Sequence, residues 1–581
     1  MVPPLATPGG MEERSDEGPH IPPSMSKMSF SRPVLFAVMA GTLAAPAIAD
    51  RPRHVPTSDP QSAYVRGRAA DDLGQLGVAA ANFAAAAQDN PANTTLALRA
   101  FRQAVVAGDM TLALKAARGL DASGSLPPDG TLLLFAEAIG AHDWKRAGGL
   151  VDRIEREKLF GFLAPVMRGW IAYGARSGDP LAPLLAVPAG SLAASYAAEH
   201  RGLLLIASGK ETAGVAALDA LPHPDTARAA RLAIAAAATL DKRHKHDEAL
   251  AMLVGDAPSV HAARAILAVH GKLPGAIDTP AAGIGELFAR VAADINKEQA
   301  APLALDFARM GTMLAPDDSE TWLVTANLLS LGGANQAALD ALGHVGAKDP
   351  FAGAARDMRL TLLVRTGHQD QALAEARAAT AAPDATMGDW ARLGDLLTNA
   401  KRPAEAAQAY DRALALSGGD KAQAEIAWPL LLQEASALLD AGDWPGAKTK
   451  ATRALALAPQ EPAVLNFLGY SQIEHGDDVP GGTALIAQAS KLAPDDPAIT
   501  DSLGWSWYLR GDLARAIPLL EAAARGAPAE SDINEHLGDA YWKAQRRLDA
   551  RYAWRAALIV ADGAQADRIR AKIDNGPSAT P

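Results

Sequence analysis

A period of 34 residues runs along most of this chain and constrains its fold more than any other feature. Leu503-Gly504-Trp505 recurs as Leu537-Gly538-Asp539, and the two glycines are 34 residues apart. The same place in earlier units is occupied by Gly469, Ala435, Gly394, Leu360, Ala326 and Ala292. A fixed period of about 20–50 residues indicates an array of stacked supersecondary units. The sequence therefore predicts a repeat protein rather than a single compact domain.

Each unit carries a second small side chain and, in several cases, a closing proline. A small residue lies twelve positions after the first place, at Ala304, Ala338, Ala372, Ala406, Ala447, Ala516 and Ala550. Several units end near Pro316, Pro350, Pro459 and Pro528. Proline cannot continue the hydrogen-bond ladder of a helix, and small residues let two helices approach closely. Each unit is therefore predicted to be a helix pair, joined by turns such as Gly442-Asp443 and Gly511-Asp512.

This arrangement resembles the tetratricopeptide repeat, which has about 34 residues and two antiparallel helices. The resemblance extends over roughly residues 60–560. It implies an all-α fold, a right-handed superhelical solenoid of about thirteen antiparallel helix pairs. The first half of the chain keeps the same spacing less regularly, at Gly67, Phe101, Phe135 and Gly169.

The pattern divides the chain into six segments. They are an upstream segment with a signal peptide at 1–49, a linker at 50–60, a degenerate N-terminal array at 61–254, an irregular junction at 255–284, a C-terminal array at 285–561, and a capping helix with a tail at 562–581. A weak unit within a repeat stack can act as a hinge, because each unit contacts only its neighbours. The junction is therefore the expected place for a hinge.

A targeting signal is expected within residues 25–50. Lys27 and Arg32 precede an apolar run at 34–46, and small residues follow as far as Ala49. This order is typical of a secretory signal peptide that is cleaved after Ala49. The run is also shorter than the about 20 residues of a membrane span. A buried N-terminal helix is the alternative interpretation.

Because signal peptides begin at the N-terminus, residues 1–24 do not fit this interpretation. We expect translation to begin at Met25 or Met28. The mature protein is then expected in a bacterial periplasm, without a transmembrane span.

Net charge and cysteine content exclude several classes of function. The net charge of −11 argues against a general binder of nucleic acid or anionic membranes, because both surfaces repel acidic proteins. The chain has no cysteine, so disulfides, thiolate metal sites, cysteine nucleophiles and a lipidated N-terminal cysteine are all excluded. We therefore expect no nucleic-acid partner.

Three short motifs resemble catalytic or ligand-binding sequences only in part. The segment 208–212 (SGKET) lacks the first glycine of a phosphate-binding loop. Ser506 lacks the second glycine of a nucleophile elbow and falls within a predicted helix. His244 and His246 lie on a charged turn and supply too few ligands for a metal site. We predict no enzyme activity, no catalytic residue, no metal and no cofactor.

In the family that the chain resembles, ligands lie along the concave face formed by the first helix of each pair. The inward positions of three late units carry aromatic, acidic and amide side chains: Asn466, Tyr470, Asp501, Trp505, Tyr508, Glu535, Asp539 and Trp542. Aromatic rings beside carboxylates suit a peptide with basic and apolar residues. The alternative is that these aromatic residues pack between neighbouring units.

The expected function is that of a non-catalytic scaffold or adaptor. Its partner would be a protein or peptide of the bacterial cell envelope, in assembly, secretion or export machinery. Two alternatives remain open: an accessory subunit that positions a cell-wall or polysaccharide enzyme, and a direct carbohydrate binder that uses the groove tryptophans. The resemblance does not decide between them, because function resides in sites and not in folds.

Overall fold

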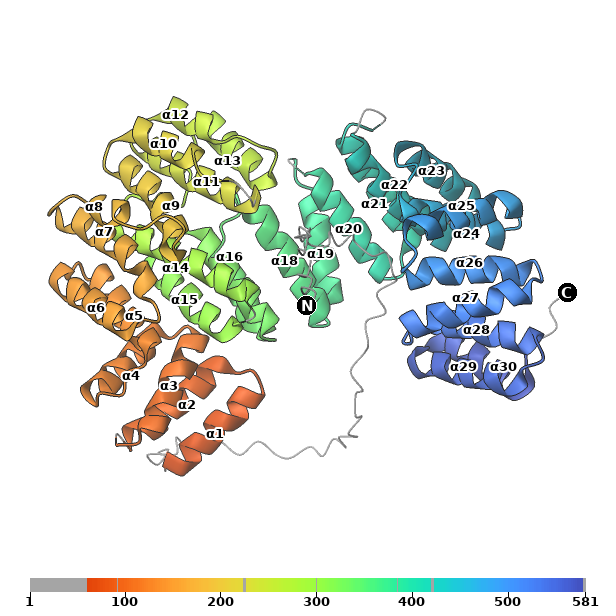
Figure 1. The fold of residues 1–581 in the computed structure, drawn as a ribbon, viewed down its shortest axis with the longest axis horizontal. Helices are drawn as coiled ribbons and strands as arrows, with labels where there is room; N and C mark the ends of the chain where they lie inside the picture. Colours follow the sequence, from red (N-terminus) through yellow and green to blue (C-terminus); the bar gives the residue numbers. More distant parts are fainter. Residues whose placement is uncertain are drawn as a thin grey trace, which may run out of the picture. The chain divides into compact units, whose positions relative to one another are not determined.

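The computed structural model describes residues 60–577 except 91, 223–225, 299, 384 and 420–422. Within these residues thirty α-helices and one short 3-10 helix follow one another, and no strand occurs. The predicted all-α fold class is therefore confirmed. The described chain forms two compact units, an N-terminal unit that ends at Ala372 and a C-terminal unit that begins at Leu373 (Figure 1). The predicted signal peptide lies outside the described residues.

The N-terminal unit contains helices α1 to α18 and the first residues of α19. Their bounds are α1 Pro60–Asp72, α2 Leu76–Gln88, α3 Thr94–Ala107, α4 Met110–Ala122, α5 Pro128–Gly140, α6 Trp144–Glu157, η1 Gly161–Leu163, α7 Ala164–Ala175, α8 Ala182–Leu185, α9 Leu192–Ala207, α10 Glu211–Asp219, α11 Thr226–Lys242, α12 His246–Met252, α13 Pro258–Ala268, α14 Pro280–Lys297, α15 Ala301–Leu314, α16 Ser319–Leu331, α17 Asn335–Leu342, α18 Ala352–Arg365 and α19 Gln369–Thr380. The irregular junction predicted at 255–284 thus holds α13 and the start of α14, and its role as a hinge stays a prediction.

The C-terminal unit is a regular series of helix pairs followed by a single helix. Its bounds are α20 Met387–Asn399, α21 Pro403–Leu416, α22 Ala424–Asp440, α23 Trp444–Leu457, α24 Pro462–Glu474, α25 Val479–Leu492, α26 Pro497–Leu509, α27 Leu513–Gly526, α28 Ser531–Lys543, α29 Arg547–Val560 and α30 Gly563–Asn575. The even-numbered helices from α20 to α28 are the first members of the pairs, and each packs on the helix that follows it.

Close contacts between paired helices explain the repeated glycine. A Cβ atom on Gly538 would lie 2.3 Å from Cδ1 of Trp554, and one on Gly394 would lie 2.6 Å from Cε1 of Tyr410. No real Cβ atom approaches another carbon so closely, so any larger residue forces the two helices apart. In these two pairs the glycine of the first helix and the aromatic residue of the second therefore form one contact, which fixes the spacing of the pair.

The Gly-Asp turns predicted between paired helices act through two separate effects. Gly442 and Gly511 have φ values of 82° and 78°, a region that glycine enters without steric strain. Each following aspartate caps the next helix, since Asp443 accepts a hydrogen bond from the backbone N–H of Gly446 and Asp512 accepts one from Arg515. Such caps stabilise a helix by about 1 kcal/mol. Together they end one helix and begin the next with three residues between them.

The N-terminal unit departs from a simple stack, because α14 and α15 fold back onto earlier helices. Helix α15 packs against α3 and α5, while α14 packs against α5, α7 and α9. The guanidinium of Arg309 on α15 donates to the carbonyl of Val106, 203 residues earlier. The Phe307 ring lies edge-on to Phe160, with ring centroids 5.3 Å apart. In this unit a pair of the chain's own helices covers the face of the earlier array.

Candidate functional site

The candidate groove lies on the first helices of three successive pairs in the C-terminal unit. Helix α24 carries Asn466 and Tyr470, α26 carries Asp501, Trp505 and Tyr508, and α28 carries Glu535, Asp539 and Trp542. Helix α26 packs against both α24 and α28, so these residues share one surface of the unit.

Trp505 is the centre of this surface. Its ring stacks on Tyr508 with centroids 4.5 Å apart and on His536 with centroids 4.0 Å apart. Its Nε1–H donates to Glu474 over 2.8 Å. One aromatic side chain therefore contacts residues of three helices. We call Tyr470, Glu474, Asp501, Trp505, Tyr508 and His536 the acidic–aromatic cluster.

Asp501 is a buried carboxylate, and one of its two oxygens accepts no hydrogen bond from a described residue. The residue is only 6 % exposed, and its Oδ2 lies 2.8 Å from Nδ1 of His536. Its Oδ1 is buried and has no hydrogen-bond partner among the described residues. The side-chain oxygen of Asn466 is in the same situation. Because an unpaired buried polar atom costs about 1–3 kcal/mol, both atoms suit a ligand that brings hydrogen-bond donors.

Charges in the cluster shift the pKa of the His536 imidazole and of the Tyr470 hydroxyl. Burial lowers the pKa of His536, but the carboxylate charges of Asp501, Asp532 and Asp539 and the hydrogen bond to Asp501 raise it above its ordinary value. Burial raises the pKa of Tyr470, and the charges of Glu474 and Asp501 add to this effect. The cluster therefore favours a positive charge placed against it.

Three of the predicted groove residues are engaged by the C-terminal helix α30. Arg568 donates two hydrogen bonds to the carboxylate of Glu535, and Lys572 donates to both Glu535 and Asp539. Although burial raises the pKa of Glu535, these cations lower it to about 2. Trp542 packs on Trp554 of α29, with ring centroids 5.4 Å apart, and against the apolar cluster that includes Ile569 of α30. These three residues belong to the attachment of α30, which leaves the acidic–aromatic cluster as the candidate site.

Two members of the cluster were missed by the sequence analysis. Glu474 and His536 do not lie at the positions that the repeat pattern marks as inward, yet both contact Trp505. The sequence signal that could have located them is their spacing from Gly469 and Gly538, which lie on neighbouring first helices. Lys543 also lies over the ring of Tyr508, 4.4 Å from its centroid.

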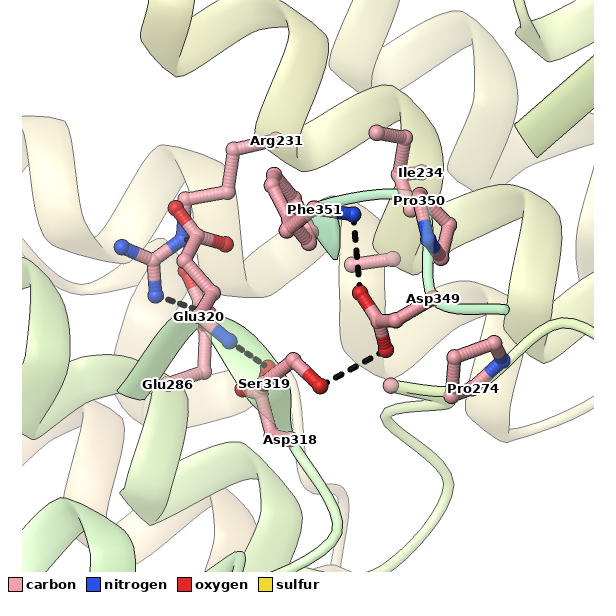
Figure 2. Close-up of a pocket in the computed structure, with 12 residues that line it drawn as sticks. Arg231, Ile234, Pro274, Glu286, Asp318, Ser319, Glu320, Asp349, Pro350 and Phe351 are labelled. Carbon is pink, nitrogen blue, oxygen red and sulfur yellow. Dashed lines mark hydrogen bonds and ion pairs between the residues drawn. The ribbon is translucent and has the colours of Figure 1, made fainter. Parts of the chain in front are cut away.

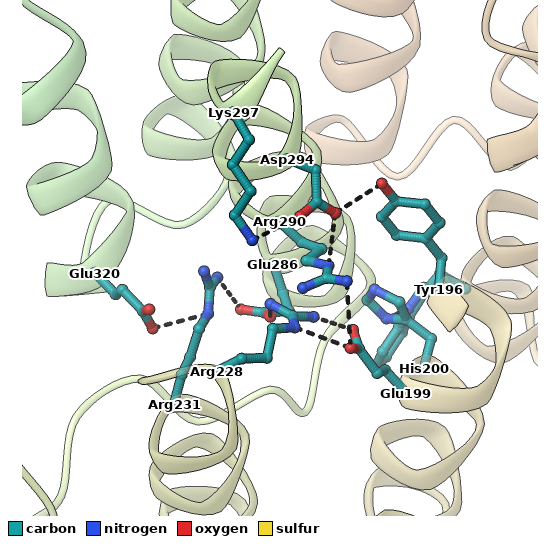
Figure 3. Close-up of polar contacts among 11 residues, drawn as sticks. Tyr196, Glu199, His200, Arg228, Arg231, Glu286, Arg290, Asp294, Lys297 and Glu320 are labelled. Atoms are coloured by element: carbon teal, nitrogen blue, oxygen red, sulfur yellow. Dashed lines mark hydrogen bonds and ion pairs between the residues drawn. The ribbon is translucent and has the colours of Figure 1, made fainter. Parts of the chain in front are cut away.

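A second group of polar side chains lies buried in the N-terminal unit (Figure 3). Arg231 lies between Glu286 and Glu320, and Arg228 pairs with Glu199. Arg290 and Tyr196 both contact Asp294. These side chains come from α9, α11, α14 and α16 and alternate in charge. Since nearly every member is paired inside the protein, the network holds helices together rather than offering a site.

A small cavity lies beside this network, next to Asp318 and Asp349 (Figure 2). Ser319 donates to Asp349 over 2.6 Å, and the Phe351 N–H donates to the other oxygen of the same carboxylate. The volume is about 10 Å³, which holds about one water molecule. Burial raises the pKa of Glu320 to about 8 against the opposing charge of Arg231. At about 10 Å³ the cavity is too small for a substrate or cofactor.

The three partial motifs have structural roles in the described chain. Ser506 lies inside α26 and donates to the Leu503 carbonyl over 2.7 Å. His246 lies 3.0 Å from Asp241. The segment 208–212 comprises the turn between α9 and α10 and the first two residues of α10. No group of three or more His, Asp or Glu side chains among the described residues is arranged to hold a metal ion. None of the described helices has the length and apolar composition needed to cross a bilayer.

The antiparallel helix pairs and the glycine contact within several of them give the described chain a tetratricopeptide-type helical-repeat fold. No protein-family model and no curated protein matches the sequence. Several solved structures are similar in fold. A tetratricopeptide repeat protein from Parabacteroides merdae is 13 % identical, with a TM-score of 0.37, over 44 % of this chain and 97 % of that one.

Two further structures extend this comparison. The Cut9–Hcn1 hetero-tetramer of the APC/C matches at 12 % identity and a TM-score of 0.36, over 90 % of this chain and 97 % of the other. Pseudomonas aeruginosa PilF matches at 15 % identity and a TM-score of 0.30, over 38 % of this chain and 97 % of PilF. Similarity this low carries no role from those proteins to this one.

Proposed function

We propose that the protein is a non-catalytic scaffold of the bacterial cell envelope that binds a peptide segment of a partner protein at the acidic–aromatic cluster. The observation that supports this most directly is the buried, unpaired Oδ1 of Asp501 beside the stacked rings of Trp505 and His536. A bound segment that donates a hydrogen bond to this oxygen removes the penalty of leaving it unpaired.

The chemistry of the cluster specifies the ligand. Carboxylates of Asp501 and Glu474 favour a lysine, an arginine or a free amine, because an opposite charge stabilises them. The half-buried ring of Tyr470 offers an apolar contact beside them. The segment bound is therefore one that carries a cationic residue next to an apolar one.

The envelope location rests on the sequence between Lys27 and Ala49, which lies outside the described residues. A basic start, a short apolar run and a small-residue cleavage site direct a protein to secretion. Assembly, secretion or export machinery is the proposed setting. An accessory subunit that positions a cell-wall enzyme is a special case of the same scaffold, and the identity of the partner distinguishes it.

A direct carbohydrate binder is less well supported. Sugars stack on a free aromatic face, and the ring of Trp505 is already stacked on Tyr508 and His536. Glycan-array binding that disappears in Trp505→Ala would reverse this preference.

The test is a selection of peptides from a random phage library on the full-length protein, followed by affinity measurement. We expect cationic–apolar sequences whose binding weakens about tenfold in Asp501→Asn and Trp505→Ala. The matched control is Trp322→Ala, which removes another tryptophan stacked on a histidine, His344, in the N-terminal unit. Equal binding by all variants, or selection of acidic sequences, would refute the proposed site. N-terminal sequencing of the exported protein tests the location separately.

A further inference from the structure

A second cavity, in the N-terminal unit, has no role in the proposed function. It has a volume of about 610 Å³ and lies among α10, α11 and α12. It is lined by apolar side chains, among them Leu218, Leu232 and Met252, and by the carboxylates of Glu211, Asp219 and Glu248. This volume falls within the range of about 300–1,000 Å³ that is typical of ligand pockets.

The cavity arises because two helices are unusually short. Helices α10 and α12 have nine and seven residues, whereas α11 between them has 17. The second helices of the C-terminal pairs have 14 residues, as in α21 and α27. The two short helices therefore cover the long one incompletely. Apolar side chains such as Val215, Ala233 and Met252 stay only half-buried where a longer helix would cover them.

The floor of the cavity is apolar and its rim is acidic. Leu218 and Leu232 are 3 % and 6 % exposed, while Val254 at the edge is 76 % exposed. The lining contains three carboxylates, those of Glu211, Asp219 and Glu248, and no cation. Arg243 pairs with Glu211, and Nζ of Lys245 lies 3.8 Å from the carboxylate of Glu248. Asp219 forms no ion pair with any described residue and is therefore the carboxylate of the rim that is left for a ligand cation. An anionic amphiphile such as a fatty acid is disfavoured by this rim, and a cationic amphipathic ligand is favoured.

The shape of the cavity favours a helix over a small molecule. Lining residues follow one stripe of α10 from Glu211 to Asp219, which corresponds to a length of about 13 Å. Two turns of a bound helix extend over about 11 Å. Such a helix places apolar side chains at i, i+4 and i+7 into the groove and its flanking cations beside the rim.

We propose that this cavity, which we call the α10–α12 groove, binds a short amphipathic helix of a partner protein that carries lysine or arginine beside large apolar residues. The proposal does not depend on the acidic–aromatic cluster, which lies in the other unit. It gives the scaffold a second attachment point with its own specificity.

The probe is a fluorescein-labelled, helix-forming peptide of leucine and lysine at helical spacing, with a matched peptide in which glutamate replaces every lysine. We expect the full-length protein to bind the lysine peptide with micromolar affinity, and the glutamate peptide at least about tenfold more weakly. Fluorescence anisotropy measures both affinities. Equal affinities for the two peptides, or no binding of the lysine peptide, would overturn the proposal.

Variants test whether binding occurs in the groove or through the general negative charge of the protein. Ala233→Trp fills the groove and should weaken binding about tenfold, whereas Ala216→Trp places the same ring on the exposed side of α10 and should leave it unchanged. Asp219→Asn with Glu248→Gln should weaken binding, and Asp247→Asn, which is outside the lining, should not. Nonspecific attraction would make Ala233→Trp bind like the parent protein and would contradict the proposal.

Photo-crosslinking keeps the test independent of how well the variants fold. A benzophenone group at the centre of the apolar face of the lysine peptide should label residues of α10, α11 or α12 in the unaltered protein. Labels confined to the acidic–aromatic cluster would overturn this proposal and support the other site. Trp505→Ala should leave labelling of the α10–α12 groove intact, so the two proposals fail separately.

Discussion

The indole of Trp505 lies nearly parallel to the imidazole of His536, with ring centroids 4.0 Å apart and an interplanar angle of 17°. The two rings come from successive first helices, α26 and α28. His536 also contacts Asp501 of α26, and Trp505 donates to Glu474 of α24. The same side chains that form the candidate site therefore hold three repeat units together, and their substitution is expected to affect both stability and binding.

Replacing Trp505 with alanine should lower the free energy of unfolding of the C-terminal unit by about 1–3 kcal/mol, because two ring contacts and a hydrogen bond are lost. Trp505→Phe keeps a stacking ring and should lose less. Urea denaturation followed by circular dichroism measures the difference. An alanine variant as stable as the parent protein would show that the stacked rings do not hold the units together.

His536 should contribute a pH-dependent part of this stability. Because its pKa is raised in the folded protein, its contribution is fully present below the unfolded value of about 6.5 and is lost as the pH rises through the folded value. Asp501→Asn removes the carboxylate that does most to raise the pKa of His536, so it should lower that pKa. Nuclear magnetic resonance titration of the imidazole measures this directly. An unchanged titration in Asp501→Asn would contradict the assignment.

Glu535→Ala should loosen the C-terminal helix α30, since Arg568 and Lys572 then lose their shared carboxylate. The destabilisation should be about 1–3 kcal/mol, kept modest because the Arg568 side chain is 56 % exposed. Hydrogen exchange should rise in residues 563–575 and stay unchanged in α20. The pKa of Glu535 is held at about 2, so this attachment should persist until the pH falls from about 4 towards 2. Unaltered exchange in α30 would refute its dependence on Glu535.

Asp306 should make the N-terminal unit less stable as the pH rises. Burial raises its pKa to about 7, and the nearby charge of Asp129 adds to this effect. The folded unit then binds a proton that the unfolded chain releases near pH 4, so stability falls between about pH 4 and pH 7. Asp306→Asn should raise the melting temperature above that of the parent protein by more at pH 8 than at pH 5. The exposed control Asp317→Asn should show no such difference between the two pH values. A parallel pH dependence in both variants would contradict this role.

The C-terminal helix pairs were predictable because their signals are local. The contact between Gly538 and Trp554 lies within one unit, and Gly504, 34 residues earlier, contacts Leu520 in the preceding unit. The contact of Arg309 with the Val106 carbonyl extends over 203 residues. Nothing in the repeat pattern marks such a pair, so the fold-back of α14 and α15 was not foreseen.

The candidate site was predictable only in part. Trp505 and Asp501 stood out because the repeat register places them on one face of a first helix. Glu535 and Asp539 share that register, but their partners Arg568 and Lys572 lie on α30, beyond the last pair. The α10–α12 groove depends on the length of two helices, and a residue pattern locates helix ends poorly.

The fold-back of α15 onto α3 has a consequence during synthesis of the chain. Helix α3 leaves the ribosome about 200 residues before the helix that covers it, which corresponds to roughly 10–40 s of translation. During that interval the Val106 carbonyl and the Phe160 ring lack the partners that Arg309 and Phe307 later supply. An open repeat array can fold unit by unit as it emerges, but this unit must wait for its fifteenth helix.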